Sequence, residues 1–211
     1  MKNTKEKILE CALRLFNTQG ISKVSLRTIA NDMDISLGNL TYHFKKRDDI
    51  VESLYLELVA KMDAMTLQNV NDTNLLESFF KISDLIAESF YEYRFIMLDF
   101  VQITRNYPTI QSHYRELIKV REQQFQLLIA ALIRVDLIRE EIIKDEYVYL
   151  FKELKILSDF WLPALSIEQD IITKEDIVKH ATLLKTKIFP YLTENGRTTF
   201  QKMNLTTKNH E

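Results

Sequence analysis

The chain has 211 residues, of which 46% are hydrophobic, and it contains only three glycines and three prolines. Hydrophobic content this high excludes wholesale disorder, and the length suits one large domain or a small domain joined to a larger one. Sheet proteins use glycine and proline in their many turns, so their scarcity favours long helices joined by few loops. The single cysteine, Cys11, excludes an intramolecular disulfide.

The net charge of −2 is unevenly distributed along the chain. The first 50 residues carry nine lysines and arginines against six carboxylates, a net charge of +3, whereas the remainder carries −5. A basic N-terminal region followed by an acidic remainder is expected of a DNA-binding protein with a separate regulatory domain. The polar start and the lack of a long apolar segment predict no signal peptide and no membrane span, so we expect a cytoplasmic protein.

The N-terminal region contains signals for three short helices. Apolar residues recur at helical spacing over 5–18, and Gly20 follows at the position that glycine favours after a helix. Ser25 can cap a second helix, and Ser36 can cap a third that directs Leu40 toward the core. These three helices define a predicted domain over residues 1–46.

The rest of the chain, residues 47–211, is predicted to form a larger helical domain. Its first helix, over 47–69, links the two domains and has acidic residues in its first turn, where the helix dipole favours them. Later helices follow from apolar spacing, caps and prolines: one over 75–90, a buried apolar stretch over 95–103, one that begins at Pro108, one that Pro163 stops and one that Thr173 caps. The tail from Thr193 is polar and is predicted to be loose. We therefore expect an all-α protein of about nine helices.

The segment from Ser25 to Phe44 carries the most specific functional signal. Two short helices separated by a tight turn make a helix-turn-helix, and the Ser36 cap leaves the first turn of the second helix free to enter a DNA major groove. Gly38 lies in that helix, where glycine costs about 1 kcal/mol relative to alanine. Two interpretations of Gly38 stay open: close approach of the backbone to DNA, or a neutral, tolerated glycine.

These residues resemble a known family. The sequences Ser-Leu-Arg-Thr-Ile-Ala at 25–30, Ile-Ser-Leu-Gly-Asn-Leu at 35–40 and Tyr-His-Phe-Lys at 42–45 are similar to the DNA-binding signature of the TetR family, and 8–16 with Gly20 is similar to its first helix. The resemblance covers about the first quarter of the chain. It implies a helical ligand-binding and dimerisation domain after the helix-turn-helix. It also implies a homodimeric transcriptional regulator, by default a repressor, that a small, largely apolar effector releases from a palindromic operator.

Three positions depart from the family pattern. Thr41 stands where the family often has tyrosine, so its hydroxyl reaches less far toward a phosphate. Asp34 replaces the usual glycine of the turn, and aspartate tolerates left-handed backbone angles. Arg47 replaces a lysine, which keeps the charge and adds bidentate geometry.

DNA contacts are predicted from position and exposure. Two consecutive aromatics before Phe44 cannot both face one core, so Tyr42 and His43 are expected to be exposed. The amide of Asn39 can pair with adenine, whereas the basic side chains after the recognition helix suit phosphates. The predicted DNA-contacting residues are Ser25, Arg27, Thr28, Ser36, Gly38, Asn39, Thr41, Tyr42, His43, Lys45 and Arg47.

An effector site is predicted where aromatic residues and methionines gather in the middle of the chain. Ligand pockets are mostly apolar with a few polar anchors, and helical bundles can hold them between helices. The alternative, that each of these residues is simply core, stays open. The candidate effector residues are Met62, Met65, Phe79, Phe90, Arg94, Met97, Phe100, Gln102 and Phe125.

A two-fold dimer is predicted because one helix-turn-helix reads only a few base pairs. The last two long helices carry more apolar residues than one core requires, and in the family such helices form an intersubunit bundle. The alternative, that both stripes pack within one chain, stays open. The nominated interface residues are Leu150, Leu154, Leu157, Ile177, Ala181, Leu184 and Ile188.

Two other classes of protein are alternatives to a DNA-binding regulator: a helical-bundle enzyme and a helix-turn-helix adaptor that binds protein. Di-iron bundles need Glu-x-x-His pairs, and here His113-x-x-Glu116 is single and in the reverse order. Phosphate-loop, nucleophile-elbow and dinucleotide motifs are absent from the sequence. We therefore expect no catalytic residues, no metal and no cofactor. The exposed basic recognition surface argues against the adaptor.

Overall fold

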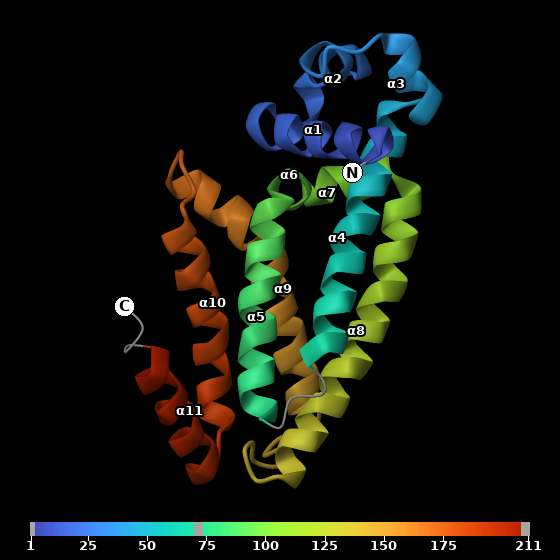
Figure 1. The fold of residues 1–211 in the computed structure, drawn as a ribbon. Coiled ribbons are helices and arrows are strands. Elements are labelled where there is room, and N and C mark those ends of the chain that lie inside the picture. Colours follow the sequence, from blue (N-terminus) through green and yellow to red (C-terminus); the bar gives the residue numbers. More distant parts are fainter. Residues whose placement is uncertain (1–2, 70–73, 208–211) are drawn as a thin grey trace.

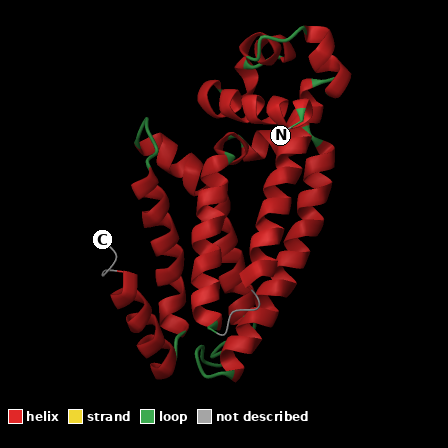
Figure 2. Cartoon of the chain, viewed as in Figure 1, coloured by secondary structure: helices red, strands yellow, loops and turns green. Residues whose placement is uncertain are grey.

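The computed structural model describes residues 3–69 and 74–207, and this part of the chain is helical without a β-strand (Figure 2). One isolated bridge joins Ile138 to Leu192. The all-α prediction is therefore confirmed, with eleven α-helices in the described residues where about nine were expected. No helix among the described residues is both long enough and apolar enough to cross a membrane.

The N-terminal helices form a small unit at one end of the molecule (Figure 1). They are α1 (Thr4–Gln19), the short 3-10 helix η1 (Ile21–Lys23), α2 (Leu26–Asp32) and α3 (Leu37–His43). The side chains that hold this unit together are almost completely buried, and they include Ile8, Phe16, Ile29, Leu40 and Phe44. Apolar spacing thus directs the side chains of these three helices toward one core, which α4 and α6 help to enclose.

Local backbone signals define the ends of these helices as predicted. Gly20 ends α1 with φ at 81°, a left-handed conformation that glycine adopts without steric cost. Asp34 occupies the turn between α2 and α3 with φ at 54°. This aspartate therefore supplies the left-handed residue that the turn requires.

The rest of the chain forms an elongated bundle below this unit (Figure 1). Helix α5 lies at its centre, packed against both α4 and α10, and α8 packs against α9. The helices are α4 (Arg47–Asn69), α5 (Leu75–Glu92), α6 (Arg94–Leu98), α7 (Phe100–Asn106), α8 (Pro108–Arg134), α9 (Glu146–Glu168), α10 (Lys174–Ile188), the 3-10 helix η2 (Phe189–Tyr191) and α11 (Glu194–Thr207).

The apolar stretch 95–103 forms two short helices, α6 and α7, which cross under α1 (Figure 1). Asn17 of α1 joins the two parts of the molecule through its amide. Its Nδ2 donates to the carbonyl of Glu92 at 2.7 Å, and its Oδ1 accepts from the amide of Phe95 at 3.1 Å. The rings of Phe16 and Phe95 lie 5.0 Å apart, so one apolar core continues across this junction.

The prediction that Pro163 stops a helix was wrong. Helix α9 continues through Pro163 to Glu168. A proline inside a helix removes the amide that would bond the carbonyl four residues earlier, here that of Asp159. The neighbouring side chains of Trp161 and Leu162 are buried, and this tertiary packing compensates for the lost bond.

The prediction of a loose tail from Thr193 was also wrong over the described residues, because Glu194–Thr207 forms α11; residues 208–211 lie outside the described part of the chain. Phe200 and Met203 of this helix pack on the core at the end of the bundle opposite α1. An added Cβ at Gly196 would lie 2.1 Å from the carbonyl oxygen of Leu137, so only glycine allows this close approach. Tertiary contacts, and not the apolar content of the segment alone, order the tail.

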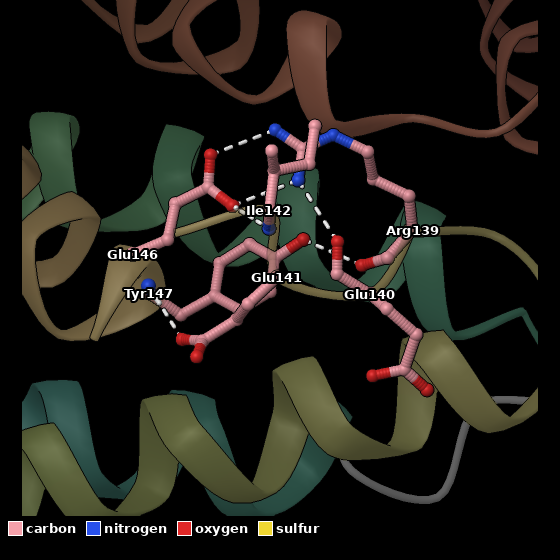
Figure 3. A network of polar contacts seen from close by, with 6 residues as sticks. All are labelled: Arg139, Glu140, Glu141, Ile142, Glu146 and Tyr147. Atoms are coloured by element: carbon pink, nitrogen blue, oxygen red, sulfur yellow. Dashed lines mark hydrogen bonds and ion pairs between the residues drawn. The ribbon is translucent and has the colours of Figure 1, made fainter. Parts of the chain in front are cut away.

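A polar network fixes the corner between α8 and α9 (Figure 3). Arg139 donates two hydrogen bonds of 2.8 Å to the carboxylate of Glu146, which also accepts from the amide of Ile142. The hydroxyl of Tyr147 donates to the carbonyl of Arg139 at 2.6 Å, and Glu141 accepts from the amide of Tyr147. The bonds from Arg139 and then from the Ile142 amide lower the pKa of Glu146 to about 2.

Candidate functional site

Helix α3 presents one polar face to solvent and one apolar residue to the core. The amide of Asn39 donates to the Ser36 hydroxyl at 3.1 Å, which is the predicted cap. Tyr42 is 84% exposed, whereas Leu40 is fully buried. His43 is half-buried with its ring edge against Tyr42, at a centroid distance of 5.2 Å. The structure thus leaves Asn39 and Tyr42 free to contact a partner.

Helix α2 is held by a reciprocal cap at its first turn. The amide of Thr28 donates to the Ser25 hydroxyl at 3.1 Å, and the Thr28 hydroxyl accepts from the amide of Ser25 at 3.3 Å. Arg27 between them is exposed. Ser25 and Thr28 therefore support the fold in addition to their predicted contacts with DNA.

The fold does not itself require glycine at position 38. Gly38 is exposed, and the nearest atom to an added Cβ would be the hydroxyl of Ser36 at 3.9 Å. The hydroxyl of Thr41 donates to the carbonyl of Gly38 at 3.1 Å, so part of its bonding capacity is used within α3. Neither interpretation of Gly38 is contradicted, and a close approach of DNA would be unobstructed here.

The basic segment after α3 divides into exposed and engaged side chains. Lys45 is exposed. Arg47 is half-buried: its Nη1 donates to the carbonyl of Ile21 at 3.1 Å, and its Nε lies 3.9 Å from a carboxylate oxygen of Asp48. The same oxygen of Asp48 accepts from the hydroxyl of Tyr107 at 3.2 Å. Arg47 therefore helps to anchor the N-terminal unit on α4 and α8.

A cavity of about 550 Å³ lies inside the bundle, lined by residues of α4 to α10 and predominantly apolar. This volume is within the range of small-molecule sites. Helix α4 contributes five side chains to its wall. Six of the nine candidate effector residues line the cavity, namely Met62, Phe79, Phe90, Met97, Phe100 and Phe125.

Three candidate effector residues do not line this cavity. Met65 accepts a hydrogen bond from Ser89 through its sulfur at 3.7 Å. Arg94 turns back along the chain, donating to the carbonyl of Tyr91 and stacking over its ring. Gln102 is exposed and donates to Asn106. Arg94 and Gln102 lie on the short helices α6 and α7, whose orientation could not be predicted from apolar spacing.

Three polar residues of the cavity wall were missed by the sequence reasoning. Tyr114, Lys155 and Asp159 line it together, and Asp159 is only 6% exposed. Burial raises the pKa of Asp159, while the Tyr114 hydroxyl and the Lys155 ammonium oppose that rise. The sequence did hold a signal for Asp159. It lies one turn before Leu162 on the inward side of an apolar helix, and a carboxylate at such a position needs a polar partner.

A second tyrosine connects the cavity wall to the far side of α8. The hydroxyl of Tyr55 lies 3.0 Å from Nδ1 of His113, with the rings edge to face. Burial raises the pKa of Tyr55 to about 12, so its hydroxyl stays neutral at any physiological pH. Tyr55 is thus a fixed link between α4 and α8.

Most of the nominated interface residues belong to the chain's own core, which corrects the choice of residues. The apolar stripe of α10 packs against α5, so its residues are already buried within one chain. Five of the seven are buried, namely Leu150, Ile177, Ala181, Leu184 and Ile188; Leu154 and Leu157 are half-buried. Apolar side chains that these two helices do expose are Tyr149, Ile156, Phe160, Ile167, Val178 and Leu183.

The described residues bring together no group of three or more His, Cys, Asp or Glu side chains that could hold a metal ion. His180, for example, is buried and stacked on Trp161 at a centroid distance of 4.3 Å, and its burial lowers its pKa to about 4. It is therefore a neutral packing residue at physiological pH.

Comparison with known proteins extends the similarity beyond the first quarter of the chain. Residues 8–54 match the family described as bacterial regulatory proteins, tetR family, and residues 57–200 match the one described as bacterial transcriptional repressor. A probable HTH-type transcriptional regulator, YttP of Bacillus subtilis, is 40% identical over 55 residues, 26% of this chain and 27% of that protein. The matched region thus spans about a quarter of the length of such curated relatives.

Solved structures with the same fold cover almost the whole chain. A TetR-family transcriptional regulator from Marinobacter aquaeolei has a TM-score of 0.78 at 23% identity, covering 96% of this chain and 97% of that one. The ketosteroid transcriptional regulator KstR2 of Mycobacterium tuberculosis has a TM-score of 0.71 at 16% identity, covering 92% and 97%. At such low identity these structures establish the fold alone.

Both family matches are to regulators and not to enzymes, which agrees with the sequence prediction. The longer of them covers more than half of the chain, and the shorter covers the helix-turn-helix described above. The chain belongs to the TetR family of bacterial transcriptional regulators.

Proposed function

We propose that this regulator binds a palindromic operator as a homodimer, represses transcription there, and leaves the DNA when a small, largely apolar effector enters the cavity. The observation that carries the proposal is the course of α4. This helix begins at Arg47, against the N-terminal unit, and the side chains from Tyr55 to Thr66 line the cavity.

The DNA contacts divide into two kinds. Asn39, on the exposed face of α3, would read a base edge, because its amide can pair with adenine, and Tyr42 on the same helix would reach either a base or a phosphate. Lys45 and Arg47 are suited to phosphates, which fix position but carry no sequence information. Alanine at Lys45 should therefore weaken all DNA sequences alike, whereas alanine at Asn39 should change the preference among operator variants.

Effector release would depend on a shift of α4 relative to the bundle. The helix is 23 residues long, so at about 1.5 Å per residue it spans on the order of 35 Å. Arg47 and the Asp48–Tyr107 hydrogen bond fix its upper end against η1 and α8. An effector can release DNA only if it binds the DNA-incompetent form more tightly, and DNA must then weaken effector binding by the same factor.

The homodimer is proposed to form through the exposed apolar face of α9 and α10. This face is defined on α9 by the exposed residues Tyr149, Ile156, Phe160 and Ile167, which recur at intervals of seven, four and seven and so share one side of the helix, and α10 adds the exposed Val178 and Leu183. Two copies would bring two α3 helices to half-sites related by two-fold symmetry, which is how a palindrome is read.

The dimer is tested by light scattering at micromolar concentration. The protein should have twice the mass of one chain, and Ile156→Glu should reduce that mass to one chain. Ile142→Glu is the matched control, because Ile142 is also exposed but lies in the α8–α9 corner, outside the proposed face. A monomeric wild type would overturn the dimer.

The regulatory function is tested by selecting DNA duplexes from a random library and then measuring the affinity of the protein for the selected duplexes by fluorescence anisotropy. The selected sites should be palindromic, and the affinity should fall steeply with salt, because phosphate contacts release counterions. Apolar compounds that stabilise the protein in a thermal-shift screen should then release the DNA. Failure to enrich any site would contradict the DNA-binding proposal, and enrichment without any releasing compound would leave a repressor without an effector.

A further inference from the structure

The mostly apolar wall of the cavity has a cluster of three polar side chains on α8 and α9, apart from Arg121 and Gln124 farther along α8. Tyr114 on α8, with Lys155 and Asp159 on α9, lines the end of the cavity that lies near α7. The ring of Phe100 packs edge-on against Tyr114 at a centroid distance of 4.9 Å. Because Asp159 is only 6% exposed, its carboxyl group has little access to bulk water.

The hydrogen bonds of Asp159 use only one of its two oxygens. The hydroxyl of Tyr114 donates to Oδ2, and Nζ of Lys155 lies 3.1 Å from the same oxygen. Within the described residues, Oδ1 has no hydrogen-bond or ion-pair partner. With 6% of Asp159 exposed, Oδ1 can be reached from the cavity, and a ligand hydroxyl that donates to it would form a hydrogen bond to a charged acceptor.

The charges around Asp159 restrict the kind of donor. The Lys155 ammonium already balances the carboxylate, so the pair carries no net charge. A ligand ammonium would come close to Lys155, and a ligand carboxylate would come close to Asp159, so both would meet a like charge in a poorly hydrated site. An uncharged hydroxyl donates one hydrogen bond without either repulsion.

The shape of the cavity restricts the rest of the ligand. Its wall includes side chains from Leu75 to Phe90 along α5 and from Tyr114 to Ala131 along α8. At about 1.5 Å per residue, each stretch is on the order of 20–25 Å long. A volume of about 550 Å³ distributed over that length suits an elongated molecule.

We propose that the cavity takes an elongated, uncharged, largely apolar molecule with a hydroxyl at one end, and that this hydroxyl donates to Oδ1 of Asp159. The inference rests on the proposed effector function and names the class of compound that would serve it. The competing account is that Tyr114, Lys155 and Asp159 only cross-link α8 to α9. In that case no preference for a hydroxyl would depend on Asp159.

Four probes with the same 12-carbon chain separate these accounts: dodecan-1-ol, dodecanoate, dodecylammonium and dodecane. Binding to the full-length protein is measured by calorimetry in the absence of DNA. Dodecanol should bind more tightly than the other three, by about 10-fold to 100-fold over dodecane, because a hydrogen bond to a charged acceptor is worth that factor. Tighter binding of the anion or the cation, or no binding by any probe, would overturn the proposal.

Variants then assign the preference to Asp159. The double variant Lys155→Met with Asp159→Leu removes both charges without leaving one unpaired, and it should bind dodecanol and dodecane about equally. Tyr114→Phe keeps Oδ1, so the preference for the alcohol should survive. Ser83→Ala is a second control, because the Ser83 hydroxyl lines the cavity but donates to the carbonyl of Phe79. Survival of the preference in the double variant would overturn the assignment.

Operator release is measured separately, so that the two proposals can fail independently. Binding of dodecanol without release of DNA would support the ligand class and contradict the effector role. Release of DNA by other compounds, with no preference for the alcohol, would support the regulatory function and overturn the ligand class.

Discussion

The N-terminal unit and the bundle differ in how their side chains pack. In the unit, three helices close around residues such as Leu40 and Ile29, which are fully buried, and each helix begins with a side-chain cap. The bundle is longer, retains a cavity of about 550 Å³, and tolerates Pro163 inside a helix. The proposed reading surface would have to hold its shape, whereas the proposed effector cavity would have to accommodate a ligand, and the difference in packing agrees with those two proposals.

The largest effect is expected where the two regions share a core. Phe16→Ala should cost about 3–5 kcal/mol of unfolding free energy, because it removes a fully enclosed ring that packs on Phe95. Phe125→Ala should cost clearly less, since this ring is half-buried on the cavity wall and its loss enlarges an existing space. Urea denaturation of both variants checks the order, and equal losses would mean that the cavity wall is packed as firmly as the shared core.

The next effect concerns the junction. Asn17→Ala removes the side-chain donor that bonds the carbonyl of Glu92 and the side-chain acceptor that bonds the amide of Phe95. Each backbone group left without a partner costs about 1–3 kcal/mol of unfolding free energy. Unfolding followed by urea should report this loss. The control is Thr18→Ala, which changes an exposed hydroxyl that bonds only within α1. A loss no greater than that of the control would show that packing alone holds the two regions together.

A smaller effect compares one cap in each region. Ser36→Ala and Thr173→Ala each remove a side-chain acceptor for the first turn of a helix, and each should cost about 1 kcal/mol. Only Ser36→Ala should also lower DNA affinity, because it loosens the turn of α3 that is proposed to enter the groove. Parallel denaturation and anisotropy measurements test this, and equal losses of affinity would break the comparison.

The smallest effect concerns the carboxyl group of Glu146. The folded state holds the pKa of Glu146 at about 2, below its ordinary value of 4.5. Its contribution is therefore fully present above pH 4.5 and is lost as the pH falls toward 2. Glu146→Gln should reduce stability at neutral pH and flatten this part of the pH profile, with DNA affinity at neutral pH unchanged. If the stability of the variant fell with acid as steeply as that of the wild type, other carboxyl groups would be responsible for the pH dependence.

The two regions also differ in how far the sequence predicts them. The caps at Ser25 and Ser36, the left-handed Asp34 and the inward Leu40 all depend on residues a few positions apart, so the N-terminal unit could be predicted in detail. The proposed DNA-reading face followed from the same local geometry. Arg47 is the exception, since its bond to Ile21 crosses 26 positions of the chain.

In the bundle, the sequence determined that there would be long helices and that aromatic residues would gather among them. Which face of α10 is buried, whether α9 passes through Pro163 and whether α11 forms were decided by tertiary contacts. The pairing of Tyr114 with Asp159 joins residues 45 positions apart on two helices. Helical spacing fixes the direction of a side chain relative to its own axis, but only the packing of helices against one another decides which side chains meet and where a cavity remains.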